Sequence, residues 1–240
     1  MKASEILSHV DHTLLAPTAT WEEMKRLADE AVRYRTASVC VPPAYVARLR
    51  ETYGGELNIC TVIGFPLGCD TTAAKCAAAR EAVENGADEI DAVMNRADMK
   101  NGDTKKITAE IAALKKAVGD RILKIIVEAC DLTTEEKIAA CRAVTEGGAD
   151  FIKTSTGFGK SGATHEDVDL FRAHIGENVR IKAAGGIRTV EDMEAYLAQG
   201  CDRIGASAAV RLLAEQADAE KKQHRKNVSR ETMEHNLKTK

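Results

Sequence analysis

Short apolar runs alternate with longer segments of helical pattern along most of the chain. The apolar runs are rich in β-branched residues, which is typical of buried strands. The pattern predicts eight strands, at residues 9–14, 37–41, 58–63, 89–93, 123–127, 151–154, 179–183 and 203–204.

Between these runs the sequence carries helix signals. Apolar residues from Met24 to Ala31 recur at helical spacing, and Thr20 is a suitable N-cap. Thr133 and Glu136 have the spacing of a capping box. Helices are predicted at residues 20–34, 71–84, 103–118, 133–145, 164–174 and 189–197, with a short one ending near 52 and a last one from about 208.

One sequence phrase occurs three times, at residues 85–90, 147–152 and 199–204. Each copy runs from a glycine through a small residue and an aspartate into a strand. Together with eight strand–helix units, this repetition predicts an α/β fold, a single-domain (β/α)8 TIM barrel over residues 1–213. The alternative is a doubly wound open sheet, but residues 13–17 do not form its usual phosphate loop.

Residues 214–240 break the alternating pattern. Twelve of these 27 residues are charged and few are apolar. We expect a charged C-terminal tail, most simply a solvated helix.

Composition narrows the functional classes. The net charge of −3 and the 4% aromatic content argue against a nucleic-acid partner. No run approaches 18 apolar residues and no signal-peptide pattern is present, so we expect no membrane partner. Seven cysteines without a CxxC pair favour free thiols in a reducing compartment. We therefore expect a cytoplasmic protein.

Ionisable residues gather at the C-terminal ends of the predicted strands, where barrel active sites form. Side chains alternate along a strand, so Lys153, Lys182 and Asp91 fall on the phase opposite their apolar neighbours and point inward. Asp11 and Cys40 end the first two strands. One such charge would merely meet water at the barrel mouth, but several together favour an active site.

Lys153 and Lys182 end consecutive predicted strands, which lie about 5 Å apart in a sheet. Two ammonium groups at that spacing disfavour each other's charge, so one pKa should fall. A neutral amine is a nucleophile, and Asp91 or another inward carboxylate could move protons. The pattern predicts Schiff-base chemistry, and the alternative is that one lysine simply pairs with Asp91.

Loops rich in glycine and hydroxyl groups follow the last three predicted strands. Glycine lets backbone N–H groups approach an anion closely, and a helix beginning near Ser207 would add its positive end. Barrels commonly bind phosphate at the loops after strands seven and eight, so phosphate binding is favoured over plain tight turns. The candidate residues are Thr156, Gly157, Gly185, Gly186, Gly205 and Ser207.

Other chemistries have less support. The six histidines form no HxH or HExxH motif, so we expect neither a metal nor another cofactor. No histidine is placed to activate Cys40 as a nucleophile. We expect Cys40 and Asp11 to contribute to the substrate-binding site instead.

The chain resembles the deoxyribose-phosphate aldolases, class I Schiff-base enzymes of the (β/α)8 type. The similarity runs in order over roughly residues 5–213. The matching phrases are DHTLL at 11–15, SVCVP at 38–42, EID at 89–91, FIKTSTG at 151–157 and IKAAGGIRT at 181–189.

The resemblance implies reversible cleavage of 2-deoxy-D-ribose 5-phosphate to acetaldehyde and D-glyceraldehyde 3-phosphate, in deoxyribonucleoside catabolism. By position, Lys153 would form the Schiff base, Lys182 would depress its pKa and Asp91 would relay protons. The glycines and Ser207 named above fall in segments that hold the phosphate. The expected partners are a sugar phosphate, aldehydes and further copies of the chain in a homodimer or homotetramer.

Two departures from the family pattern stand out. Some members carry paired serines in the last phosphate loop, whereas here Ala208 follows Ser207. Some members also end in a tyrosine that assists proton transfer, and this chain ends in residues HNLKTK. We expect water or Asp91 to take over that transfer.

Two other hypotheses remain open. A barrel isomerase or synthase could use Asp91 and Lys182 as acid and base without an imine. A degenerate barrel could instead sense a phosphorylated ligand, although keeping Lys153 together with the other two residues argues against that.

Overall fold

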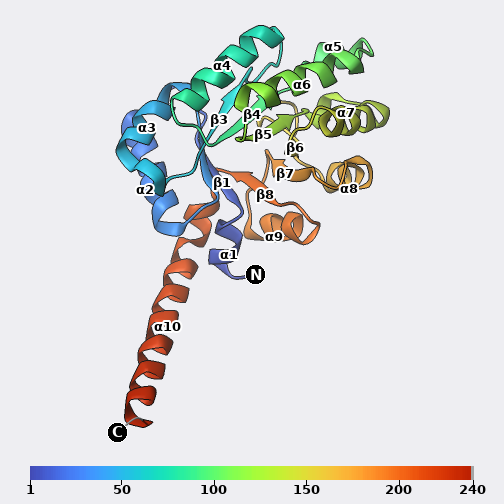
Figure 1. Ribbon diagram of the computed structural model, residues 1–240. Helices are drawn as coiled ribbons and strands as arrows, with labels where there is room; N and C mark the ends of the chain where they lie inside the picture. Colours follow the sequence, from blue (N-terminus) through green and yellow to red (C-terminus); the bar gives the residue numbers. More distant parts are fainter. Residues whose placement is uncertain (239–240) are drawn as a thin grey trace.

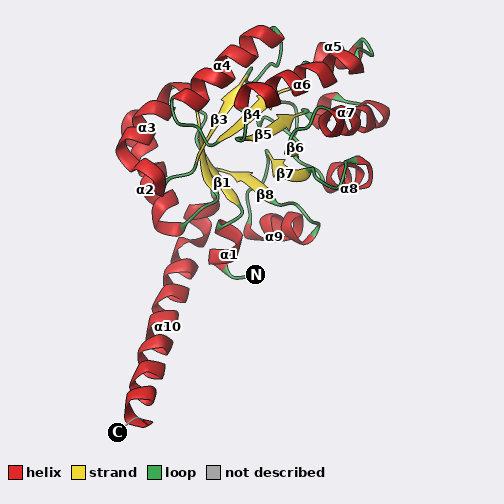
Figure 2. Cartoon of the chain, in the orientation of Figure 1, coloured by secondary structure: helices red, strands yellow, loops and turns green. Residues whose placement is uncertain are grey.

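Eight parallel strands close into a barrel, with helices around its outside (Figure 1 and Figure 2). The computed structural model describes residues 1–238, and the side chains of residues 1–223. Each strand pairs with the next in sequence and β8 closes on β1, so the predicted (β/α)8 barrel is confirmed. The strands are β1 (Val10–Thr13), β2 (Ser38–Val41), β3 (Ile59–Ile63), β4 (Glu89–Val93), β5 (Ile122–Ile126), β6 (Phe151–Lys153), β7 (Arg180–Ala184) and β8 (Arg203–Ala206).

The predicted helices are all present. They are α2 (Trp21–Tyr34), α3 (Val46–Tyr53), α4 (Thr72–Glu84), α6 (Thr104–Val118), α7 (Thr134–Glu146), α8 (His165–His174), α9 (Val190–Ala198) and α10 (Ala209–Lys238). Two further helices, α1 (Ala3–Leu7) and α5 (Arg96–Lys100), were not predicted, because they are too short to show a periodic pattern. Short 3-10 turns occupy Pro43–Tyr45, Gly54–Glu56 and Ala129–Asp131.

Capping groups define where the helices begin. Thr20 and Glu23 form a capping box before α2, with the Thr20 hydroxyl accepting from the Glu23 N–H. Thr133 and Glu136 form the predicted box before α7. Each box satisfies backbone N–H groups that the first helical turn leaves unpaired.

The two faces of the strands bury different chemistry. Ile90, Ile152 and Ile181 belong to the large apolar core between the barrel and its helices. The alternate positions point into the barrel, where Cys40 and Cys60 pack in a small separate cluster beside buried charged residues. This alternation places polar side chains at the centre of the molecule.

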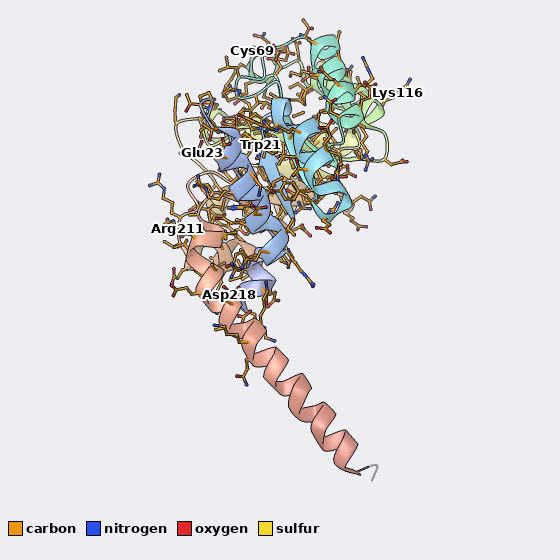
Figure 3. All side chains as sticks on the ribbon, turned by 90° about the vertical axis from the view of Figure 1, so that its left-hand side faces the viewer. Trp21, Glu23, Cys69, Lys116, Arg211 and Asp218 are labelled. Atoms are coloured by element: carbon orange, nitrogen blue, oxygen red, sulfur yellow. The ribbon has the colours of Figure 1, made fainter. Side chains whose placement is uncertain are left out.

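Helix α10 begins on the barrel and then extends well beyond it (Figure 1). The apolar residues Ala209, Val210 and Leu213 of its first turns are buried. Asp218 forms an ion pair of 2.6 Å with Arg33 of α2 near the point where the helix leaves the barrel (Figure 3). Glu220 accepts hydrogen bonds from Ser4 in α1. The predicted boundary at residue 213 therefore falls inside a continuous helix. Among the described residues, no helix combines the length and apolar character that crossing a membrane requires.

Candidate active site

A single buried carboxylate organises the centre of the barrel. Asp91 of β4 accepts Lys153 and Lys182 on the same oxygen, Oδ2, each at 2.7 Å. Lys124 of β5 binds the other oxygen, Oδ1, at 2.8 Å. All four side chains are almost completely buried, and Lys153 is the most exposed at 3%. Such charges are tolerated inside a protein only when they are paired in this way.

The strand register brings these residues together. Lys153 is directly paired with Lys182 across β6 and β7, and Asp91 with Lys124 across β4 and β5. Strand alternation predicted that Asp91, Lys153 and Lys182 point into the barrel, and the contacts of their side chains agree with this direction.

Two more carboxylates and one arginine extend the cluster. Asp11 of β1 lies 2.5 Å from Lys182 Nζ and 2.5 Å from Arg203 of β8. Glu89 of β4 lies 2.5 Å from Lys124 Nζ and 2.9 Å from Arg203. The described part of the barrel interior thus joins three carboxylates to four cationic side chains. The carboxylates are Asp11, Glu89 and Asp91, and the cations are Lys124, Lys153, Lys182 and Arg203.

These contacts set the charge states. Burial alone would raise the pKa of Asp91, but Lys124, Lys153 and Lys182 hold that pKa well below its usual range. Burial alone would lower the pKa of Lys182, but Asp11 and Asp91 outweigh it and raise the pKa. We expected one lysine of the Lys153–Lys182 pair to lose its charge easily, and Lys182 is not that lysine.

A cavity of about 510 Å³ opens above the cluster at the C-terminal ends of the strands. Its walls are the loops after β1, β6, β7 and β8. The predicted site residues that line it are Lys153, Thr156, Gly157, Gly185, Gly186, Gly205 and Ser207. Among the described lining residues Lys153 is the one lysine, so it connects the buried charges with the cavity.

The loop after β7 has the backbone that an anion site needs. Gly185 and Gly186 both have positive φ, at +82° and +76°, a conformation that favours glycine. Ser207 lies two residues before the start of α10, so that helix presents its positive end to the cavity wall. These features suit a phosphate group.

The other predicted site residues lie below the cavity and do not line it. Asp91, Lys182 and Asp11 are completely buried in the charge cluster. Cys40 is buried with Cys60, and its interaction with the Cys60 thiol lowers the pKa of Cys40 although burial opposes this. Any direct contact of Asp11 or Cys40 with a substrate would therefore need the cavity floor to move.

Two groups of side chains have the spacing of metal ligands. They are Cys40, Cys60 and Asp91, and Asp11, Cys60 and Glu89, with ligand atoms within 4.8 Å of one another. Lysine and arginine side chains already pair with these carboxylates. A metal ion would have to displace these cations, so the donor set does not fit a resident metal well.

Several site residues were absent from the predicted set. Lys124 and Glu89 lie at inward-facing positions of their strands, and this alternation could have identified them from the sequence. Arg203 begins a strand predicted as only two residues long, so its direction could not be assigned. Phe158 and Arg188 line the cavity from loops, where no periodicity reveals which side chains face a ligand.

Comparison with known proteins supports this description. The model of the DeoC/LacD family aldolases matches residues 6–239. The deoxyribose-phosphate aldolase of Clostridium botulinum strain Alaska E43 is 58% identical over 213 residues, covering 89% of this chain and 96% of that protein.

Solved structures agree. A putative deoxyribose-phosphate aldolase from Coccidioides immitis superposes with a TM-score of 0.86 at 38% identity, covering 90% of this chain and 87% of that one. The deoxyribose phosphate aldolase from Aeropyrum pernix, described as a tetramer, gives a TM-score of 0.80 at 28% identity, with 88% and 91% coverage. The predicted kinship is confirmed: this chain is an enzyme that belongs to the DeoC/LacD family of aldolases.

Proposed function

We propose that this aldolase cleaves 2-deoxy-D-ribose 5-phosphate reversibly to acetaldehyde and D-glyceraldehyde 3-phosphate through an imine on Lys153. The observation that carries the proposal is the position of Lys153. Its amine reaches the cavity while sharing Asp91 Oδ2 with Lys182. A nucleophile, a permanent cation and a carboxylate thus meet at one point.

The cluster holds one more cationic side chain than carboxylates. Four cationic side chains face three carboxylates when every group is charged. Loss of one proton leaves three of each sign, which suits a buried site better. Lys153 is the cation next to the cavity, so its proton has the shortest path to solvent or substrate.

The steps follow from this arrangement. Neutral Lys153 attacks C1 of the open-chain aldehyde, and uptake of one proton with loss of water gives a protonated imine. The imine accepts the electron pair of the C2–C3 bond as the C3 hydroxyl loses its proton, which releases glyceraldehyde 3-phosphate and leaves an enamine. Protonation at C2 and attack by water then release acetaldehyde and restore the amine. Asp91 is suited to exchange protons with Lys153 because it already accepts a hydrogen bond from it.

We infer that the glycine-rich loops after β7 and β8 hold the phosphate. Replacing Ser207 by alanine should raise KM for 2-deoxyribose 5-phosphate about 5- to 10-fold with little change in kcat, because one donor is lost. Unphosphorylated 2-deoxyribose is the matched control, and its kcat/KM should not change. Equal losses for both sugars in steady-state assays would remove Ser207 from the phosphate site.

Lys182 should govern the pH profile. Its pKa is raised, so it stays cationic at neutral pH and disfavours a second charge on Lys153. In the Lys182→Met variant, Asp91 would stabilise the Lys153 ammonium more strongly. The acid limb of the kcat/KM profile should therefore move up by about one pH unit or more. An unshifted or lowered acid limb would contradict the coupling of the two lysines.

We also propose the wider setting of this reaction. All seven cysteines lie within the described residues and are free, which supports a reducing compartment such as the cytoplasm and a role in deoxyribonucleoside catabolism. The tetrameric relative supports a homodimer or homotetramer. Residues 214–240 are proposed as a charged appendage that takes no part in the chemistry.

A further inference from the structure

Glu128 occupies an unusual position at the end of β5. It is 1% exposed, and its backbone is left-handed with φ of +52°, which is uncommon for a residue other than glycine. Such a conformation is strained and persists where its surroundings fix it. The mechanism above gives this buried carboxylate no task.

The Glu128 carboxylate is committed to one neighbouring residue. Its Oε1 accepts the backbone N–H of Thr156 at 3.2 Å, and its Oε2 accepts the Thr156 hydroxyl. Gly159 covers the carboxylate, since a Cβ there would lie 2.9 Å from Glu128 Cδ. Arg96 places its guanidinium 3.9 Å from Oε2. Glu128 therefore fixes the loop that follows Lys153.

The direction of these bonds decides what Thr156 can offer a ligand. A threonine hydroxyl has one hydrogen and two lone pairs. The Thr156 hydroxyl donates its hydrogen to Glu128, and one of its lone pairs accepts the Phe158 N–H, with 3.0 Å between N and Oγ1. One lone pair remains, and Thr156 lines the cavity. Thr156 can thus accept a hydrogen bond from a ligand but cannot donate one.

An acceptor selects a different part of the substrate than a donor does. A phosphate group presents mainly acceptor oxygens near neutral pH, because its second pKa is about 6. It gains little from a lone pair. A sugar hydroxyl carries a hydrogen that it can give.

We propose that Glu128 is a positioning residue that keeps Thr156 a hydrogen-bond acceptor, so that Thr156 recognises a hydroxyl of the sugar chain and not the phosphate. The inference rests on the proposed function for its substrate. It revises the expectation from sequence that Thr156 belongs with the phosphate-binding residues. The phosphate is left to the loops after β7 and β8.

The Glu128→Gln variant tests this directly. The amide oxygen can still accept the Thr156 N–H, and the amide nitrogen then faces the Thr156 oxygen as a donor. The Thr156 hydroxyl must turn its hydrogen elsewhere and loses its acceptor role. We expect KM for 2-deoxyribose 5-phosphate to rise about 10-fold, the scale of one lost hydrogen bond, while the inhibition constant of inorganic phosphate stays within about 2-fold.

Changes at Thr156 separate positioning from folding. Thr156→Ser keeps the hydroxyl and should retain the wild-type KM, whereas Thr156→Val should raise it about as much as Glu128→Gln does. Combining Glu128→Gln with Thr156→Val should add little beyond Thr156→Val alone, because both remove the same acceptor. If Glu128→Gln does not fold, KM and the inhibition constant of phosphate can still be measured for Thr156→Ser and Thr156→Val, and the two values show which part of the substrate Thr156 binds.

Three results would overturn the inference. The inhibition constant of phosphate could rise in parallel with KM. The effects of Glu128→Gln and Thr156→Val on KM could be additive in the double variant. Thr156→Val could leave KM unaltered. These comparisons require that the wild-type enzyme releases acetaldehyde from 2-deoxyribose 5-phosphate. A wild-type enzyme without that release would instead contradict the proposed function.

Discussion

Replacing Lys153 by methionine should lower kcat for 2-deoxyribose 5-phosphate cleavage by about 10⁴-fold or more, equivalent to about 5.5 kcal/mol in the activation barrier. Methionine keeps an unbranched side chain of similar length but cannot form an imine. Asp91 would still be held by Lys124 and Lys182, so the fold should survive. Release of glyceraldehyde 3-phosphate in a coupled assay measures the effect.

Lys160 provides the matched control for this change. It lies in the same loop region after β6, is highly exposed, and is outside the set of residues that line the cavity. The Lys160→Met variant should keep the wild-type kcat. A Lys153→Met enzyme that retains even about one tenth of the wild-type kcat would be incompatible with covalent catalysis at this residue.

Changing Asp91 to asparagine should damage both catalysis and stability. Three lysine side chains lose their shared carboxylate, and breaking a buried ion pair typically costs about 3–5 kcal/mol in the free energy of unfolding. Loss of proton exchange with Lys153 should lower kcat about 10²- to 10⁴-fold. Urea unfolding and steady-state kinetics at neutral pH measure the two effects.

A variant at Glu89 provides the control that distinguishes the effect on stability from the effect on catalysis. Glu89 is buried in the same cluster but pairs with Lys124 and Arg203, and no hydrogen bond or ion pair among the described residues joins it to Lys153. Glu89→Gln should therefore destabilise the fold while keeping most of kcat. An Asp91→Asn enzyme with the kcat of Glu89→Gln would remove Asp91 from the chemistry.

The sign of the pH effect on stability follows from the pKa of Asp91. That pKa lies well below the value of an unfolded aspartate, so the carboxylate stabilises the fold above the unfolded pKa. This contribution is lost as the pH falls through the folded-state pKa. Between neutral pH and the unfolded pKa, the stability difference between wild type and Asp91→Asn should stay constant, and below that range it should shrink.

Strand alternation was sufficient to predict the barrel and the inward direction of Lys153 and Lys182. The apolar residues beside Lys153 and Lys182 had to face the helices, so the two lysines had to face inward. Their direct pairing across β6 and β7 follows from consecutive parallel strands. Periodicity depends only on neighbouring residues, so it can be recognised in the sequence alone.

Other features depend on contacts that no local pattern encodes. Asp11 was expected at the end of its strand, yet it is the second residue of β1, and Arg203 and Lys182 hold it below the cavity, away from the lining residues. Thr156 was assigned to phosphate because its loop is rich in hydroxyl groups. Its hydrogen is taken by Glu128, which is 28 residues away in sequence, so the direction of that bond was visible only in the structure.

Trapping with borohydride tests the central claim most directly. Borohydride reduces an imine to a stable secondary amine, so incubation with acetaldehyde or 2-deoxyribose 5-phosphate should add one substrate-derived group to the protein. Peptide mass spectrometry should locate that group on Lys153, and the Lys153→Met variant should remain unmodified. An adduct on another lysine, or none in an active preparation, would contradict the imine mechanism proposed for this aldolase.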